Sequence, residues 1–300
     1  MVLDPRGSPT PPTDLLPIVA VAVVAVGPVF LAKVRTLGLL VVMLGVCVGI
    51  AWSLGVARAP EATAGPPSDP VDECRNVAFL GLRGSGEPRD AHLGYGDLVG
   101  QMRDAVRASV TGRGLTFADM PVDYPALNVA GGADWSLVKD LTAVSASGRS
   151  LFLDGAKVGA ELLASKIRLI SIVCGDRTQI VVAGYSQGAM AAHNGLSSLT
   201  KAELADVVSV DLIADPLRAA GRTDVLTGNA PRGGGIGVEV GMVDWTIATK
   251  GVRSWCLKGD PVCAYEGHPA ALLTLDVHIN GYRAAGVPAA AAKSAAHSLR

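Results

Sequence analysis

The sequence predicts an α/β fold in which a mostly parallel sheet is covered by helices on both faces. Short Val-rich apolar runs bounded by glycine alternate with longer stretches of helical periodicity, and this alternation implies right-handed crossovers between parallel strands. Aromatic residues are scarce at 4% while glycine contributes 36 of 300 residues, which suits tight turns and close helix-on-sheet contacts. With 49% hydrophobic and 18% charged residues, the chain can bury a large core, and intrinsic disorder is excluded.

Much of the apolar excess lies in the first 57 residues. Leu15–Ala32 and Leu37–Ala57 are uncharged runs of about 18 and 21 residues, close to the roughly 20 that cross a bilayer. Lys33 and Arg35 separate them, so a membrane hairpin would hold this loop in the cytoplasm and place the rest of the chain outside. A signal peptide beginning near Val34, with the translation start set too far upstream, is the alternative. Both interpretations export the remainder, and a buried hairpin of a soluble protein is disfavoured because polar interruptions are almost absent.

A linker separates this region from a folded domain. Residues 58–73 hold four prolines and no apolar periodicity, which predicts an extended Pro-rich linker. We expect the domain to occupy residues 74–288. The Ala-rich residues 289–300 predict a frayed helix or a disordered tail.

Five strands and three helices are expected within the domain. The expected strands are residues 76–82, 117–124, 179–183, 207–214 and 252–257, of which 117–124 has the weakest pattern. The expected helices are residues 95–110, 148–173 and 187–196. In the second helix, apolar residues recur at helical spacing: Leu151, Ala156, Ala160, Leu163, Ile167 and Ile170.

Charge and motifs exclude several classes of function. A formal net charge of -1 provides no basic field to attract nucleic acid. No phosphate-binding loop, dinucleotide fingerprint or metal-ligand cluster occurs, so we expect no cofactor and no metal. Residues 232–237 are Gly-rich but do not join a strand to a helix, which favours a flexible loop.

Four of the five cysteines predict disulfides. Cys47 lies in an apolar run, where a thiol behaves as a small hydrophobe. The even set in an exported domain is Cys74, Cys174, Cys256 and Cys263, and four cysteines allow three connectivities. Cys256 and Cys263 enclose a tight turn, so their local pairing is the simplest choice and leaves Cys74 for Cys174. Free thiols or a zinc site are the alternative, but no CxxC pair occurs.

The motif Gly184-Tyr185-Ser186-Gln187-Gly188 follows a predicted strand and precedes a predicted helix. A serine at such a strained turn needs glycines on both sides so that neighbouring backbone can pass closely while its hydroxyl stands clear. The N-terminal N–H groups of the helix point at the same place, which favours a developing oxyanion. Although a Gly-rich chain can produce this motif by chance, its position between strand and helix predicts that Ser186 is a catalytic nucleophile.

A nucleophilic serine needs a histidine base and an orienting carboxylate. Three of the five histidines are poor candidates because of their positions: His92, His193 and His297. The first and last lie in a polar loop and in the tail, and His193 lies about two turns along the same helix as Ser186. His268 and His278 remain, and both lie near Asp260.

Asp260 is the expected carboxylate. It lies in the turn between Cys256 and Cys263 at the end of a predicted strand, and a clamped turn supplies the rigidity that an orienting carboxylate needs. A simple Asp-Pro turn former is the alternative. Asp215 is the competing carboxylate, although Asp215-Pro216 more simply ends its strand as a turn.

Several motifs together resemble the cutinase family of serine esterases, particularly its actinobacterial cutinase-like members. The resemblance covers residues 74–286 and rests on four motifs in order: Arg83-Gly84-Ser85-Gly86-Glu87, Tyr124-Pro125-Ala126, Gly184–Gly188 and Gly259-Asp260-Pro261-Val262-Cys263. It implies a lidless, compact α/β-hydrolase with a five-stranded parallel sheet, the two disulfides paired as above, and hydrolysis of carboxylic esters.

The resemblance also implies a role for each site residue. Ser186 matches the nucleophile, Asp260 the acid, and the backbone N–H groups of Ser85 and Gln187 the oxyanion hole. His278 follows Asp260 by 18 residues and precedes Gly281-Tyr282, as the family histidine does, so it is favoured over His268, which follows by only 8. The Ala-Ala-Leu-Leu-Thr-Leu insert at 270–275 departs from the compact loop of the family, so the resemblance does not predict the rim of the active site or the acyl-chain preference.

These residues predict a serine carboxylesterase, exported or anchored to the membrane by its N-terminal segments, with a monomeric catalytic domain outside the cell. Its expected substrates are lipid-like or polyester carboxylic esters, hydrolysed through an acyl-enzyme intermediate. An acyltransferase of envelope glycolipids would use the same residues with an alcohol in place of water. A non-catalytic envelope-binding protein with the same fold is disfavoured, because every catalytic role has a candidate.

Overall fold

The computed structural model describes residues 74–127, 146–219, 226–227, 229, 233–239, 247, 249, 251–265 and 275–300. All of them belong to the second of the two units into which the chain divides, Pro67–Arg300. The predictions for residues 1–73, including Cys47, lie outside the described residues, as does His268. Among the described helices, none combines the length and the apolar character needed to cross a membrane.

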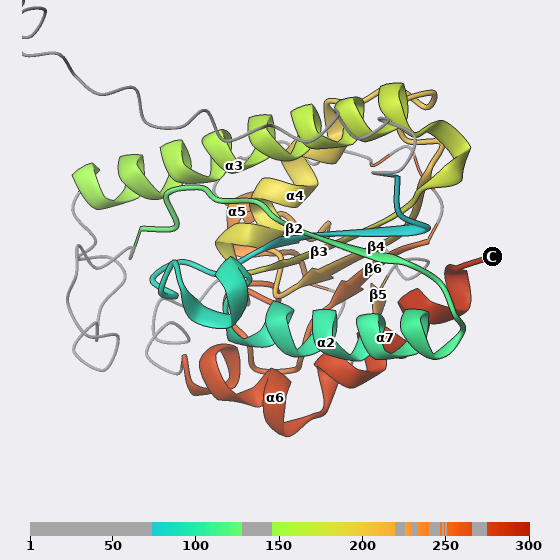
Figure 1. Ribbon diagram of the computed structural model, residues 1–300. Helices are drawn as coiled ribbons and strands as arrows, with labels where there is room; N and C mark the ends of the chain where they lie inside the picture. Colours follow the sequence, from blue (N-terminus) through green and yellow to red (C-terminus); the bar gives the residue numbers. More distant parts are fainter. Residues whose placement is uncertain are drawn as a thin grey trace, which may run out of the picture. The chain divides into compact units, whose positions relative to one another are not determined.

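Parallel pairing runs through the whole described sheet (Figure 1). Its strands, in order across the sheet, are β2 (Phe117–Pro121), β1 (Val77–Leu82), β3 (Gln179–Tyr185), β4 (Val207–Ile213), β6 (Val252–Trp255) and β5 (Leu226–Thr227). The expected five-stranded parallel sheet is therefore present, and the two-residue β5 adds to one edge. β2 forms the other edge and is only half-buried, which explains its weak apolar pattern.

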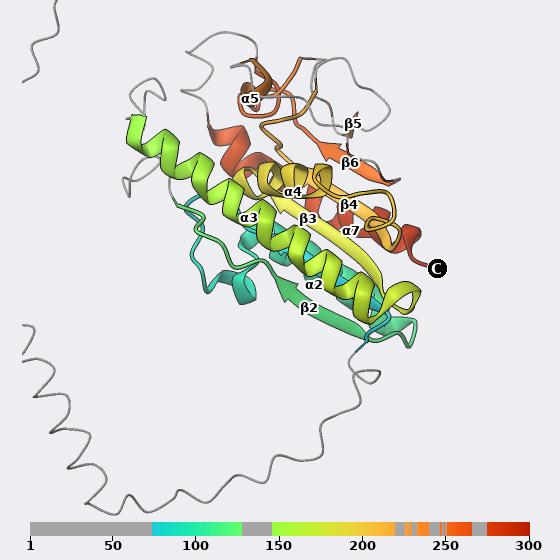
Figure 2. The same ribbon diagram turned by 90° about the horizontal axis from the view of Figure 1, so that it is seen from above.

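Two helices cover each face of this sheet (Figures 1 and 2). On one face lie α3 (Ala146–Val173) and α4 (Gln187–Ser197), and on the other lie α2 (Asp97–Gly112) and α7 (Val287–Ser298). Successive residues of β1 alternate between the two cores: Ala78 and Leu80 pack with α3 and α4, while Val77 and Phe79 pack with α2. This two-sided burial accounts for the near-continuous apolar character of the central strands.

Short helical turns complete the described fold: η2 (Ala91–Gly94), η5 (Gly175–Arg177), α5 (Ile236–Glu239), η7 (Val277–Gly281) and α6 (Tyr282–Ala284). The predicted loop at 232–237 is confirmed at residues 233–235, which lie outside helices and strands, but residues 236–237 are helical. Gly234 and Gly235 are buried, and Ile236 begins α5. A Cβ at Gly235 would lie 2.2 Å from the carbonyl oxygen of Pro216, so glycine here permits close packing rather than flexibility.

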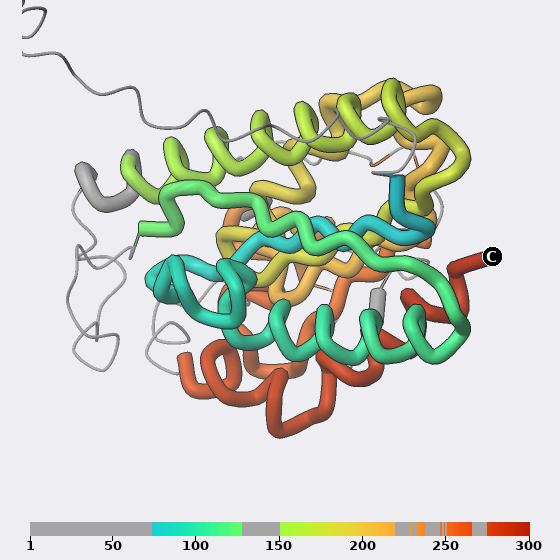
Figure 3. Tube along the Cα trace, in the orientation of Figure 1, coloured from blue at the N-terminus to red at the C-terminus, as the bar shows by residue number. Residues whose placement is uncertain are grey.

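The Ala-rich end of the chain is an ordered layer of the fold, contrary to the predicted frayed helix or disordered tail. α7 begins at Val287 and packs beside α2 across the sheet face, as the tube in Figure 3 also shows. Its inward residues Ala291, Ala292 and Ala295 are buried. Small side chains let a helix approach its neighbours closely, a use of alanine that composition alone does not distinguish from low complexity.

Both expected disulfides are present. Cys74–Cys174 joins the start of the described chain to the segment just after α3, with a Cα–Cα distance of 5.6 Å. Cys256–Cys263 spans seven residues after β6 and encloses Asp260. The first closes a loop of 100 residues, whereas the second braces a single turn at the carboxyl edge of the sheet.

Candidate active site

Ser186 occupies a sharp turn between β3 and α4. Its backbone has φ 54°, a left-handed conformation that is strained for a residue with a side chain. A Cβ at Gly184 would lie 2.4 Å from the Gly188 carbonyl oxygen, and one at Gly188 would lie 2.3 Å from that of Leu82. Both glycines are therefore required by close backbone packing, as the motif predicts.

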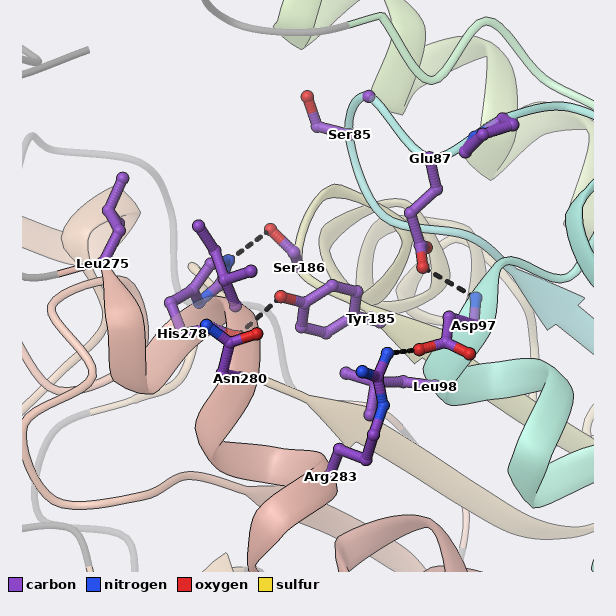
Figure 4. A pocket seen from close by; sticks show the side chains of 13 residues that line it. Ser85, Glu87, Asp97, Leu98, Tyr185, Ser186, Leu275, His278, Asn280 and Arg283 are labelled. Carbon is purple, nitrogen blue, oxygen red and sulfur yellow. Dashed lines mark hydrogen bonds and ion pairs between the residues drawn. The ribbon is translucent and has the colours of Figure 1, made fainter. Parts of the chain in front are cut away.

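The structure brings Ser186, His278 and Asp260 together, although 92 residues separate the serine from the histidine. Figure 4 shows the contact between Ser186 and His278. Nε2 of His278 lies 3.0 Å from Oγ of Ser186. Nδ1 of His278 lies 3.1 Å from each carboxylate oxygen of Asp260. Serine, histidine and carboxylate thus form a continuous hydrogen-bonded chain in the order that nucleophilic catalysis needs.

Asp260 is fully buried in the turn closed by Cys256–Cys263. Its carboxylate accepts hydrogen bonds from the Val262 N–H at 2.8 Å and from the Tyr282 hydroxyl at 2.5 Å. Burial opposes its ionisation, but the charge of His278 and the hydrogen bonds from His278, Tyr282 and Val262 outweigh burial and hold the pKa of Asp260 below its ordinary value. Asp260 therefore remains a carboxylate through the neutral range.

Two tyrosines that the sequence analysis did not single out support the histidine and the acid. The Tyr185 ring stacks on His278 with 5.3 Å between ring centroids, and its hydroxyl donates to the carbonyl oxygen of His278 at 2.7 Å. Tyr282 donates to Asp260 and accepts from the Leu257 N–H at 3.3 Å. Burial raises the pKa of both tyrosines well above the ordinary value, so both hydroxyls stay protonated donors.

A signal for one of these tyrosines is present in the sequence. Tyr282 lies four residues after His278 along the continuous helical turns η7 and α6, so both side chains emerge on the same side. The position of Tyr185 inside the serine motif carries no comparable signal, because its partner His278 is 93 residues away.

The loop after β1 carries Ser85, the other expected oxyanion residue. Arg83 Nη2 donates to the Tyr124 carbonyl oxygen and the Tyr124 hydroxyl donates to the Arg83 carbonyl oxygen, both at 2.6 Å. The Gly86 N–H donates to the Ala126 carbonyl oxygen at 2.9 Å. These bonds tie the loop to the segment after β2 and explain why the Arg83–Glu87 and Tyr124–Ala126 motifs occur together.

Gln187 begins α4, so its N–H is one of the amides that have no partner inside the helix. Its side chain is fully buried, and Nε2 donates to the Phe152 carbonyl oxygen of α3 at 2.7 Å. This contact ties the serine turn to α3. The backbone N–H of Gln187 therefore lies at the same edge of the sheet as Ser186.

The remaining candidate residues lie elsewhere. His193 and Asp215 form a buried pair, with 2.6 Å between Nδ1 and the carboxylate, which joins α4 to the turn after β4. Asp215 also accepts from the Leu217 N–H at 2.9 Å, so it does close a turn. His92 and His297 are exposed, as expected. Within the residues that the structure describes, no group of three His, Cys, Asp or Glu side chains could hold a metal ion.

A cavity of about 310 Å³ opens beside Ser186. One wall comes from the loop after β1 and the start of α2, and the other from the segment that carries His278. The lining is mixed, with apolar Leu98, Leu275 and Ile279 and polar Glu87, Asp97, Asn280 and Arg283. Such a cavity holds a small apolar group or one end of a larger molecule.

Comparisons with known proteins point to one family. The family model described as Cutinase matches residues 73–296. A cutinase of Hypocrea jecorina (strain QM6a) is 30% identical over 146 residues, which are 48% of this chain and 48% of that protein. Cutinase cut1 of Trichoderma harzianum is 38% identical over 65 residues, 22% of this chain and 26% of that protein. The chain thus spans about half the length, or less, of the curated relatives it matches.

The solved structure of a cutinase-like protein from Cryptococcus sp. shares the fold. It matches with a TM-score of 0.53 and 18% identity, over 75% of this chain and 96% of that one.

Proposed function

Because the chain belongs to the cutinase family, we propose that it is a serine carboxylesterase that acts through an acyl-enzyme intermediate. The observation that carries the proposal is the hydrogen-bonded chain from Ser186 through His278 to the buried carboxylate of Asp260. The fully buried Asp260 and the nearly buried His278 provide the fixed geometry that such a chain requires.

In the first half-reaction, Oγ of Ser186 attacks the ester carbonyl carbon while Nε2 of His278 accepts the serine proton. The carbonyl oxygen becomes an oxyanion, to which the N–H groups of Ser85 and Gln187 would donate. The tetrahedral intermediate then releases the alcohol, which leaves with the proton from His278, and the acyl group stays on Ser186. In the second half-reaction, a water molecule attacks the acyl carbon by the same steps and frees the carboxylic acid.

Asp260 orients the imidazole throughout. By accepting from the Nδ1–H of His278, it leaves Nε2 unprotonated and facing Ser186, and it stabilises the imidazolium that forms after proton transfer. Its depressed pKa supports this role because a protonated Asp260 would lose the charge that favours imidazolium.

For the substrate, we propose lipid-like or polyester carboxylic esters. The apolar side chains in the cavity and the names of the curated relatives support this class. Ile279, which lines the cavity, is 40% exposed and adds apolar surface for an insoluble ester. No observation favours the acyltransferase or the non-catalytic alternative over hydrolysis.

The proposed catalytic domain extends from Cys74 to Leu299 rather than ending at 288, because α7 forms part of the core. The two disulfides support export, since such bonds persist in oxidising compartments. Anchoring by the N-terminal apolar runs and a monomeric state stay predictions.

Covalent labelling tests the proposed function. We expect a phosphonate ester probe to form one adduct with the purified full chain, on the peptide that contains Ser186, because only an activated serine attacks phosphorus rapidly. Mass spectrometry of the digest identifies the labelled residue. An adduct on another serine, or none under conditions that label a known serine esterase, would refute the assignment.

The two disulfides should differ in their effects when each is removed by a double Cys→Ser change. Loss of Cys74–Cys174 should lower stability by about 4 kcal/mol, since it closes the long loop, with little change in kcat of the folded enzyme. Loss of Cys256–Cys263 should cost only about 2 kcal/mol by the same reasoning but should lower kcat roughly tenfold, because the turn that holds Asp260 loosens. Denaturant titration and steady-state kinetics on each variant measure both effects, and equal kcat values would contradict this division.

A further inference from the structure

We propose that Glu87 is a positioning residue that holds the Gly84–Ser85 backbone in place, so that the Ser85 N–H faces the oxyanion. This inference rests on the proposed function, because it assigns a support to the oxyanion hole of that reaction. Glu87 lines the cavity beside Ser186, and its carboxylate is turned toward α2 (Figure 4).

Both carboxylate oxygens of Glu87 accept backbone hydrogen bonds. Oε2 accepts from the Gly84 N–H at 2.5 Å, and Oε1 accepts from the Asp97 N–H at 2.7 Å. Gly84 directly precedes Ser85, and Asp97 is the first residue of α2. A single side chain therefore links the peptide adjoining the Ser85 N–H to the N-terminus of a 16-residue helix.

The start of α2 is built to receive this carboxylate. Gly96, the residue before the helix, has no side chain to cap the free N–H groups, so Glu87 takes the place of a capping residue and brings a negative charge to the positive end of the helix dipole. Gly96 has φ +71°, and a Cβ there would lie 2.2 Å from Oε2 of Glu87. Glycine at 96 thus provides both the backbone conformation and the space for the carboxylate.

The link to α2 differs from the other restraints on the loop. The hydrogen bonds and the ion pair of Arg83, Ser85 and Gly86 with the segment after β2 lead to residues 123–127. Glu87 instead joins the loop to a helix whose buried Val99, Met102 and Val106 pack into the core. An oxyanion hole is effective only when its donors are fixed before the reaction, so a restraint from a rigid element at Gly84 bears directly on catalysis.

Keeping the charge of Glu87 in a half-buried position costs free energy, and the positioning role explains why a charged residue is present there. Burial raises the pKa of Glu87, while the Gly84 hydrogen bond and the charges of Arg83, His92 and Arg283 oppose that rise. Without such partners, a half-buried carboxylate could be replaced by a neutral side chain with little loss of stability. Glutamine is nearly isosteric but offers one acceptor oxygen for the two N–H donors.

The test is Glu87→Gln in the full chain, with Arg89→Gln as the matched control. Arg89 lies two residues further along the same loop and is exposed, and its side chain bonds Asp123 rather than Gly84. For Glu87→Gln we expect kcat on a soluble short-chain ester to fall roughly 10- to 100-fold with KM changed less than about twofold, because the loss falls on the oxyanion and not on the bound ester. The rate of inactivation by a phosphonate should fall in parallel. Arg89→Gln should leave both rates unchanged.

Stability is measured alongside to separate positioning from folding. If Glu87→Gln folds poorly, Glu87→Asp provides the same comparison, since its shorter side chain cannot reach both N–H groups; we expect its kcat to fall as well. Wild-type kcat and inactivation rate in a folded Glu87 variant would overturn the inference, as would a KM increase at constant kcat. A fully active Ser186→Ala enzyme would instead overturn the proposed function, so the two failures are distinguishable.

Discussion

Replacing Ser186 by alanine should lower ester hydrolysis by roughly 10⁶-fold, the loss typical of a catalytic triad without its nucleophile. The proton acceptor and the oxyanion donors would remain, but no oxygen would be placed to attack the carbonyl carbon. Folding should be intact, because within the described residues this hydroxyl hydrogen-bonds only His278, and alanine removes no other atom than the hydroxyl oxygen and its proton. Turnover of a nitrophenyl ester by the purified full chain measures the loss.

Ser198→Ala provides a control at the other end of α4. The Ser198 hydroxyl donates to the Gly195 carbonyl oxygen at 2.7 Å and is remote from the cavity, so activity should be retained. Near-normal turnover by Ser186→Ala would refute the assignment of the nucleophile, whatever the stability of the variant.

His278→Ala should lower kcat by about 10³-fold or more, because Ser186 then has no base within hydrogen-bond reach. His268→Ala should change kcat far less. The two variants discriminate between the histidines that the sequence leaves as candidates, and steady-state kinetics at neutral pH is sufficient. The reverse ranking would move the base to His268 and require a different path from Asp260 to Ser186.

His193→Ala addresses the buried pair that the mechanism does not use. Its loss should lower stability, because Asp215 would be left in the interior without this partner, while kcat of the folded enzyme should stay near wild type. A loss of kcat equal to that of His278→Ala would mean that the pair with Asp215 takes part in catalysis.

The parts of the site that follow local rules could be predicted from the sequence. The serine motif combines a strand, two glycines and a helix within a short stretch. These features can be recognised in the sequence without knowledge of the tertiary structure. The Asp260 turn was predictable because the cysteines on both sides are close in sequence. The parallel character of the sheet also followed, since buried parallel strands produce continuous apolar runs.

Contacts between distant segments were not predictable in the same way. In the sequence Glu87 is an ordinary loop carboxylate, because nothing there shows that the start of α2 lies against it. The sequence likewise does not link Tyr185 to His278, because β3 and η7 come together only in the folded chain. The His193–Asp215 pair joins the helix after one strand to the turn after the next, so no spacing in the sequence marks it. Each of these contacts depends on the tertiary structure, which the pattern of a single segment does not contain.

The buried alanines of α7 affect where the C-terminal boundary of this domain is placed. Ala291, Ala292 and Ala295 are buried, and Leu299 beyond them is nearly so. A boundary placed by composition would treat this segment as a repetitive appendage and cut it away. Such a cut would uncover the apolar face of the sheet beneath α7 and leave α2 without its neighbour. In this domain, the stretch of sequence with the simplest composition forms one side of the core. Alanine there keeps the helix stable while letting it pack close to the sheet.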